Sequence, residues 1–537
     1  MRLLSGTLLL LFPLFAQTPP AAPPAAGTVR TDQQPADIKA YSEAASLKDP
    51  PQKAAALKKF LNDYPNSRAA QSAQRQLISA LIATRPEDAV AQVKAFEKSM
   101  PAPDAAALYR QLGADLKAAN KLPNEAEKAV RRALKLYAYA PYAAQAKAEA
   151  TKETRPAPSE AVLKSRYQAQ RASYVEAVAD MLSAKGNSSK AQKLYREALQ
   201  ANPALNSSAQ ALADAAAKAG RKDEALGYYA QSMLARTNPE SRKKFYDAWI
   251  AAKGSLSGAE EYLDQRHKQL FPLPIAVTPY QKQALRTNRV VLAEVYTGSG
   301  CPPCAGADVA FDAVLERYSR SDVAVVMYHE HIPRPDPMAN TDTISRWKWQ
   351  QGRGVPTYAV DGAVSNRGGG ARSDAPEIES LVRASIENDL LKPAGAQLSL
   401  KAAQSGGSVQ ATAVVSEIAK PNANLVLQLV LVEKEIRYSG ENSIRFHPMV
   451  ARAIHTVELK NVTSLSAAHA FSIDAVTAAL KKHLDDFEKH DDRHNKDGKF
   501  RFMERKDTID PAHLAVIAFI QDSKTREVLQ AAYAETR

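Results

Sequence analysis

Cysteine is almost absent from this chain, which has two among its 537 residues. So few cysteines exclude a fold that disulfides hold together. The two, Cys301 and Cys304, lie three positions apart, so a bridge between them closes a very small loop and stabilises the fold little. A structural zinc site needs about four ligands, and the sequence has no second cysteine pair to supply them. The pair therefore needs a chemical explanation, and we expect neither a bound metal nor a cofactor.

Long apolar runs and concentrated charge are also missing. After the N-terminal stretch, no segment approaches the ~20 apolar residues of a membrane-spanning helix. The formal net charge is +13, yet Lys and Arg are interleaved with Glu and Asp and form no compact basic block, so we do not expect nucleic acid as a partner. The hydrophobic share of 45% and the charged share of 24% are ordinary for folded proteins, and the length predicts roughly three domains.

The first residues have the pattern of a secretory signal. Arg2 gives the positive start, an apolar run follows up to Phe15, and the small Ala16 precedes a plausible cleavage point. We therefore expect residues 1–16 to be a signal peptide and the mature protein to be periplasmic or secreted from a bacterium. No cysteine follows that would carry a lipid anchor. Residues 17–37, rich in Pro and Ala, are predicted to be a linker.

Residues 38–265 are rich in Ala, Leu, Lys, Glu and Gln, with apolar residues at helical spacing. One set of residues returns 34 positions later. Gly, Ala and Tyr recur in this way at Gly186, Ala191 and Tyr195 and at Gly220, Ala225 and Tyr229. Glycine lets two antiparallel helices turn, alanine lets them approach, and tyrosine fills the groove between them.

That period is the one of the tetratricopeptide repeat, which this region resembles. Before residue 165 the pattern is weaker, with Ala129, Ala133 and Pro141 in one place and Tyr64 and Pro65 in another. A generic array of helical hairpins is the alternative there. Both interpretations predict an α-solenoid, a shape that presents a concave surface to protein partners.

A β-α-β pattern follows a proline-containing break near residue 272. Residues 290–296 form an apolar run typical of a buried strand, a helical pattern comes after the cysteines, and residues 323–328 form a second buried strand. From about residue 395 the sequence predicts a β-rich, sandwich-like C-terminal domain up to residue 537.

That C-terminal prediction rests on four segments. The expected strands are 409–415 and 425–432, the expected amphipathic helix is 474–489, and a closing hairpin is expected between 514 and 533. Its segment 440–447 and the hairpin look similar to β-sandwich domains that follow a thioredoxin-like domain in certain secreted or outer-membrane-associated bacterial proteins. That resemblance implies a binding or docking module.

The position of the cysteines matters for their chemistry. They follow a strand at the point where a helix begins, and a thiolate there is stabilised by free backbone N–H groups and the positive end of the helix dipole. We expect this to lower the pKa of Cys301 from the ordinary value of about 8.5 and make it the nucleophile. Cys304, expected one turn into the helix, then resolves the mixed disulfide. Pro302 and Pro303 are tolerated in a first helical turn, which has no N–H partners to lose.

With these motifs, residues 285–390 resemble the thioredoxin superfamily. Gly354-Val355-Pro356-Thr357 looks like the family's cis-proline loop. The resemblance implies that Pro356 lies beside the cysteines and that the backbone of Val355 pairs with a substrate chain, with Pro302 and Pro303 also at the substrate surface. Glu294 takes about the place of the family's buried carboxylate, which helps to deprotonate the resolving cysteine.

The sequence departs from the family in three places. One extra residue lies between Glu294 and Cys301 relative to thioredoxin itself, so a surface charge at the strand end is the alternative for Glu294. Gly300 stands where a Trp commonly precedes the motif. An insertion after residue 328 contains His329 and His331, which are either structural polar residues at a strand end, the favoured interpretation, or groups that tune Cys301 or bind a metal.

Two functions fit these observations. The first is an exported thiol-disulfide oxidoreductase that acts on protein thiols and disulfides through Cys301 and Cys304. It would work with a membrane or periplasmic redox partner and recruit other proteins through its repeats. The alternative is an envelope scaffold whose repeats and β-rich domain bind partners, with a non-catalytic or regulatory disulfide.

Overall fold

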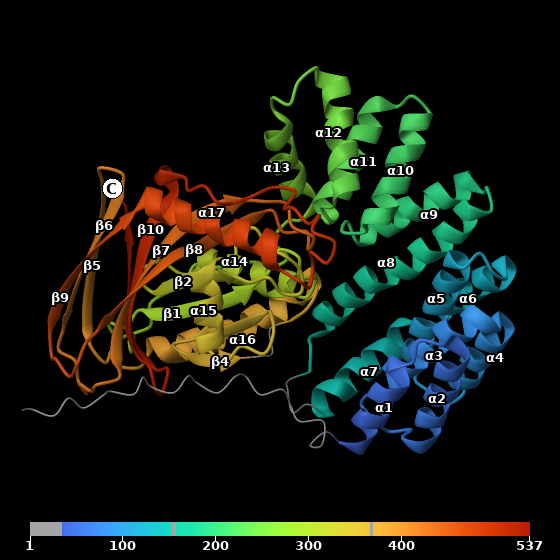
Figure 1. The fold of residues 1–537 in the computed structure, drawn as a ribbon, viewed down its shortest axis with the longest axis horizontal. Helices are drawn as coiled ribbons and strands as arrows, with labels where there is room; N and C mark the ends of the chain where they lie inside the picture. The colour runs from blue at the N-terminus through green and yellow to red at the C-terminus, as the bar shows by residue number, and fades with distance from the viewer. Residues whose placement is uncertain (1–34, 153–156, 366–368, 537) are drawn as a thin grey trace, which may run out of the picture.

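The computed structural model describes residues 35–152, 157–365 and 369–536. The predicted signal peptide, residues 1–16, and nearly all of the predicted linker lie outside the described residues. Among the described helices, none is both long enough and apolar enough to cross a bilayer. Figure 1 shows a helical array on one side and a body of sheets with covering helices on the other.

The helical array runs from residue 36 to residue 270, in agreement with the sequence prediction. Its elements follow one another as antiparallel hairpins. They are α1 (Ala36–Ser46), α2 (Pro50–Asp63), α3 (Ala70–Thr84), α4 (Pro86–Glu97), α5 (Ala102–Ala118), α6 (Pro123–Leu136), α7 (Tyr139–Lys152), α8 (Glu160–Ala184), α9 (Ser188–Ala201), α10 (Asn206–Lys218), α11 (Lys222–Ala235), α12 (Pro239–Lys253) and α13 (Ala259–Leu270).

The 34-residue repeat has a structural counterpart. Gly186 and Gly220 end the first helix of successive hairpins with φ of +79° and +73°, a conformation that glycine adopts without steric cost. The hydroxyl of Tyr195 donates to the Asp180 carboxylate at 2.8 Å, and that of Tyr229 donates to Asp214 at 2.8 Å. The second pair repeats the first 34 positions later, for the tyrosine and for the aspartate alike. The second half of the array is therefore built from tetratricopeptide-like helical repeats.

The sheet body begins with strands that hold the cysteines in place. Strand β1 (Val291–Thr297) pairs in parallel with β2 (Val323–His329) and antiparallel with β3 (Thr357–Val360), which pairs with β4 (Ala363–Ser365). Every residue of β1 and β2 is buried. The helices between and after them are α14 (Cys304–Arg317), α15 (Thr341–Trp349) and α16 (Ala375–Leu390).

Several C-terminal segments form elements that the sequence predicts, namely β6 (Ser408–Ser416), β7 (Leu425–Arg437), α17 (Ile473–His490), β10 (Leu514–Asp522) and β11 (Val528–Glu535). The structure adds three strands that the sequence analysis did not predict, β5 (Gln397–Ser405), β8 (Phe446–Glu458) and β9 (Leu465–Ser472). Contrary to the expectation from the sequence, the C-terminal strands do not form a domain separate from residues 285–390. Strands β7, β8, β10 and β11 continue the sheet of β1 to β4, in the order β11-β10-β7-β8-β2-β1-β3-β4, because β8 pairs with β2.

The second sheet, β5-β6-β9, supplies the sandwich-like part. Its buried side chains pack with one face of β7 and β10, while the other face of those strands shares a core with β1, α14 and α16. Residues 285–390 and 395–537 therefore share one large sheet and are covered by different layers.

The helical array is tied to the sheet body by ion pairs. Arg445, fully buried in the loop before β8, reaches Asp264 at 2.6 Å and Glu260 at 2.8 Å, both on α13. Arg166 of α8 pairs with Glu377 of α16 at 2.5 Å. Because these charges are largely shielded from water, they hold the two parts more firmly than exposed pairs do.

Candidate functional site

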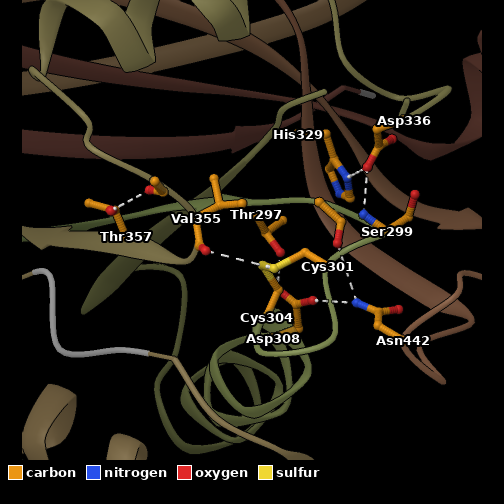
Figure 2. Close-up of a disulfide and its surroundings, with 12 residues drawn as sticks. Thr297, Ser299, Cys301, Cys304, Asp308, His329, Asp336, Val355, Thr357 and Asn442 are labelled. Atoms are coloured by element: carbon orange, nitrogen blue, oxygen red, sulfur yellow. Dashed lines mark hydrogen bonds and ion pairs between the residues drawn. A yellow bond between two sulfur atoms is a disulfide. The ribbon is translucent and has the colours of Figure 1, made fainter. Parts of the chain in front are cut away.

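A disulfide joins Cys301 and Cys304 at the junction of β1 and α14 (Figure 2). Cys304 is the first residue of the helix, and Pro302 and Pro303 lie in the turn before it. The expectation that Cys304 lies one turn into the helix, with the prolines in its first turn, is corrected here. The free N–H groups of the first turn still lie next to the cysteine pair, and both prolines are exposed.

The segment before β3 reaches the disulfide. The Val355–Pro356 peptide bond is cis, and the carbonyl oxygen of Val355 lies 3.8 Å from Sγ of Cys301 (Figure 2). A disulfide sulfur carries no proton, so this is a contact in the oxidised form. In the reduced form the Cys301 thiol has an acceptor there. The structure thus places Val355 and Pro356 beside the cysteine pair.

Glu294 lies elsewhere. Its side chain is fully buried and accepts from Arg346 of α15 at 2.9 Å and from Gln350 at 3.3 Å. Successive residues of a strand point to opposite faces, so Glu294 and Thr297, three positions apart, face opposite sides of the sheet. Thr297 faces α14, and Glu294 faces α15. Glu294 is therefore an internal ion-pair partner rather than a surface charge, and the described contacts join it to neither cysteine.

The carboxyl on the cysteine side is Asp308, which the sequence analysis missed. It follows Cys304 by four residues on α14, so the two share a helix face (Figure 2). Asp308 is 4% exposed and accepts from the Thr297 hydroxyl at 2.6 Å and from the Asn442 amide at 3.5 Å. Burial raises the pKa of Asp308 to about 7, although the Thr297 hydrogen bond opposes this rise. The spacing of four residues between Cys304 and Asp308 in a predicted helix could have identified this carboxyl from the sequence.

The insertion after β2 builds a second polar group. Asp336 is fully buried, and its carboxylate contacts His329 Nδ1 at 2.9 Å and accepts from the backbone N–H groups of Ser299 at 2.6 Å and Met338 at 2.8 Å. Burial alone raises its pKa, but these contacts outweigh burial and hold the pKa of Asp336 below its ordinary value. His329 thus anchors the carboxylate that holds the cysteine turn.

His331 contacts this group through Nδ1, which accepts from the backbone N–H of Asp336 at 3.0 Å, and the other edge of its ring faces α17. It meets His483 at 3.0 Å between the two Nε2 atoms, and burial lowers its pKa to about 4. Within the described ranges, no three His, Cys, Asp or Glu side chains gather in a way that could hold a metal ion. In this structure both histidines connect segments of the chain.

Both sulfur atoms are enclosed. Cys301 is 1% exposed and Cys304 is 0% exposed. The cover comes from the insertion and from the β7–β8 loop, whose Glu441 N–H donates to the Ser299 carbonyl at 2.8 Å and whose Asn442 amide donates to the Gly298 carbonyl at 3.4 Å. Exchange with a protein thiol therefore requires part of this cover to move.

Comparison with known proteins gives weak similarities. A scan against models of protein families finds no match, and neither does a search of curated proteins. Among solved structures, HBP35 of Porphyromonas gingivalis is similar with a TM-score of 0.33 and 14% identity, over 47% of this chain and 76% of that one.

Two further structures align over parts of this chain. The crystal structure of MamA is similar with a TM-score of 0.25 and 18% identity, over 38% of this chain and 96% of that one. The assembly chaperone of RpL4, Acl4, gives a TM-score of 0.28 and 16% identity, over 45% of this chain and 92% of that one. These scores are too low to support a functional argument.

Proposed function

We propose that this protein is an exported thiol-disulfide oxidoreductase with a thioredoxin-like unit at its centre. One observation carries the proposal: the Cys301–Cys304 disulfide lies at the N-terminus of α14, directly after a buried strand, and faces the carbonyl that precedes Pro356. The order β1-α14-β2, followed by the antiparallel β3 and β4 and by α16, supports the thioredoxin-like assignment.

The proposed exchange needs only thiols. A substrate thiolate attacks Sγ of Cys301, the bond to Cys304 breaks, and its electron pair leaves on Cys304 as a thiolate. A second substrate thiolate then attacks the substrate sulfur of the mixed disulfide and releases Cys301. The substrate has become a disulfide and the protein a dithiol. The reverse sequence reduces a substrate, with Cys301 as nucleophile and Cys304 as resolving thiol.

Asp308 has a role in this exchange. Its carboxyl lies one turn beyond Cys304 on the same helix face, and at a pKa of about 7 it is present in both protonation states near neutral pH. It can give a proton to the leaving thiolate of Cys304 or take one from its thiol. We assign it the function that the resemblance to the thioredoxin superfamily implies for Glu294.

The rest of the chain suits an enzyme that acts on proteins. The helical repeats recruit protein substrates, a membrane or periplasmic partner restores the redox state of the cysteines, and the N-terminal signal directs export. Val355 supplies a backbone acceptor beside Cys301, and the exposed Pro302 and Pro303 border the surface where a substrate arrives.

Thiol trapping tests the proposal. Samples equilibrated across a series of glutathione redox buffers are quenched with acid and alkylated, and the oxidised fraction is read by mass. The wild-type chain should titrate between two forms that differ by two thiols, and Cys304→Ser should accumulate a mixed disulfide at Cys301. A pair that stays oxidised in every buffer and with every protein dithiol contradicts an exchange function.

A second candidate is a scaffold with a non-catalytic or regulatory disulfide. The enclosure of both cysteines favours a non-catalytic bridge, because such a bridge needs no access to a substrate. Changing both cysteines to serine separates the two functions. A scaffold keeps its partner binding and its cellular role after this change, whereas an oxidoreductase loses its role.

A further inference from the structure

The segment Glu330–Met338, between β2 and α15, lies directly on the cysteine turn. A Cβ atom added to Gly298 would be 2.7 Å from a carbonyl oxygen of this segment, and one added to Gly300 would be 2.8 Å from Cβ of Arg334. These distances leave no space between the segment and the turn. The disulfide cannot meet a protein substrate while the segment stays in this position.

A histidine of this segment is fixed to α17. The ring of His331 lies edge to edge with that of His483, with planes 3° apart and centroids 5.3 Å apart, and it stacks on Phe487, with centroids 3.9 Å apart. Its Nε2 lies 3.0 Å from Nε2 of His483, and its Nδ1 lies 3.0 Å from the backbone nitrogen of Asp336. Nδ1 of His483 lies 3.3 Å from the Thr341 hydroxyl. Three polar contacts thus run in series through the two rings.

Only neutral rings satisfy all three contacts. The backbone N–H of Asp336 donates, so Nδ1 of His331 accepts and its proton is on Nε2. That proton is donated to Nε2 of His483, whose own proton is then on Nδ1, toward Thr341. A further proton on either ring would place two donors opposite each other. Protonation therefore costs at least one of these hydrogen bonds.

The surroundings favour the neutral state. Burial lowers the pKa of His331 from 6.5 to about 4 and also lowers that of His483. The charges that face His331 are Asp336 and Asp491, which favour protonation, and His494, which opposes it together with His483. His483 faces Asp486, which favours its protonation. The stabilisation from these hydrogen bonds between neutral rings is therefore complete above about pH 6.5 and declines as the pH falls toward 4.

The histidine pair is linked to the cysteine turn through Asp336. Its backbone N–H meets His331, while its carboxylate accepts from the N–H of Ser299, two residues before Cys301. Loss of the first contact removes one of the contacts that hold Asp336 beside the cysteine turn.

Further contacts hold the segment. Nε2 of His494, in the loop after α17, lies 3.4 Å from the Pro333 carbonyl oxygen, so the contacts on the side of α17 are made by histidines. On the side of the cysteine turn, the backbone N–H of Glu330 donates to the Thr297 carbonyl at 2.9 Å, and Arg334 pairs with Glu441 at 3.0 Å.

We propose that Glu330–Met338 is a cover over the cysteine pair that is closed when His331 and His483 are neutral and opens on acidification. This deepens the redox function proposed above by giving that site a regulation. It predicts that the disulfide becomes more accessible to an attacking reagent in an acidic environment than at neutral pH, although the thiolate fraction of an attacking thiol itself falls as the pH is lowered.

The test measures access to the disulfide with a phosphine reductant, which needs no catalytic activity of the protein. Its reduction rate is measured at about pH 7.5 and about pH 4.5 and divided by the rate for a small peptide disulfide in the same buffer. This ratio should rise roughly five- to tenfold at the lower pH, as the loss of one hydrogen bond of ordinary net strength predicts. Near-ultraviolet circular dichroism checks that the chain stays folded.

Two variants identify the cause. In the double variant H331Q/H483Q, amide groups can make the same series of contacts but do not titrate, so the ratio should be the same at both pH values. His455→Gln is the matched control, because His455 stacks on another histidine, His469, with ring centroids 3.7 Å apart, and no described contact joins this pair to the cysteine turn. This variant should keep the full response. A wild-type ratio that does not change with pH, or a double variant that responds as the wild type does, overturns the cover. If the ratio responds but no protein thiol is ever exchanged, the redox function fails and the cover stands.

Discussion

Two buried carboxyl groups near the disulfide differ in what surrounds them. Glu294 meets the guanidinium of Arg346 and the amide of Gln350 on the far side of the sheet from the cysteines. Asp308 meets one hydroxyl and one amide, so burial dominates and raises its pKa to about 7. A group with this pKa can exchange a proton with a thiol near neutral pH. We therefore propose Asp308 as the group that transfers the proton.

We predict that Asp308→Asn changes the pH profile of disulfide reduction by a small dithiol. After correction for the thiolate fraction of the dithiol, the wild-type rate should fall as pH rises through about 7, because the carboxyl loses the proton that Cys304 needs. The variant should lack this inflection and be roughly tenfold to a hundredfold slower below pH 7. Rapid acid quenching and alkylation measure the rate.

Asp312→Asn is the matched control, because burial also raises the pKa of Asp312 to about 7 but it lies two turns from Cys304. The Asp312→Asn variant should keep the inflection. If it also loses the inflection, the inflection does not report the protonation of Asp308 alone.

The pH dependence of stability gives a second measure of Asp308. The folded pKa of Asp308 lies above its ordinary value of 3.8, so its ionisation destabilises the fold as pH rises through about 7. Asp308→Asn should remove that decline.

At the scale of elements, the sequence predicts several strands and helices, but not the strands β5, β8 and β9 and not how the strands pair. The apolar runs at β1 and β2 and the alternation in β6 are local patterns, and they indicate the right element at the right place. The contact of β8 with β2, in which Val450 is the partner of Met327, joins residues far apart in the chain and leaves no local pattern. The sequence alone therefore does not predict that one sheet runs through both predicted domains.

The same distinction explains the candidate site. Cys301, Cys304 and Pro356 carry short motifs and were found. The orientation of Glu294 depends on the strand's register, since a shift of one residue turns a side chain to the other face. The enclosure of the disulfide depends on loops from distant parts of the sequence, such as the one that carries Asn442.

A shared sheet predicts shared stability. Phe519 of β10 is fully buried in the core that also contains Tyr296 of β1. Phe519→Ala should cost about 3–5 kcal/mol and lower the protection of the β1 and β10 amides against hydrogen exchange together, by about two orders of magnitude or more. Phe245→Ala, an equally buried change in the helical array, should leave β1 protection unchanged. Loss of protection in β10 alone would mean that the C-terminal strands unfold as a separate unit.

At the scale of the whole molecule, the helical array contacts the loop that covers the cysteines. The backbone N–H of Thr237 donates to the Gly440 carbonyl at 3.2 Å, and Nε2 of His267 lies 3.0 Å from the Ser443 carbonyl oxygen. The neighbouring residues Glu441 and Asn442 reach the cysteine turn. The repeats and the disulfide are thus joined through one loop, next to the buried ion pairs of Arg445.

Removing that buried charge should release the array. Arg445→Met keeps most of the side-chain volume but takes the buried cation from Glu260, which is partly exposed, and from Asp264, which keeps Arg437 at 2.8 Å, at a cost of about 1–3 kcal/mol. We expect a larger radius of gyration in small-angle X-ray scattering and faster proteolysis between α13 and β1. Arg131→Met is the matched control, since its pair with Glu127 lies within α6 and is half exposed, and it should change neither measure.

An unchanged radius for Arg445→Met would show that the apolar contacts and the ion pair of Arg166 hold the array without Arg445. If the array is released and the disulfide also becomes easier to reduce, the β7–β8 loop transmits the position of the repeats to the redox site.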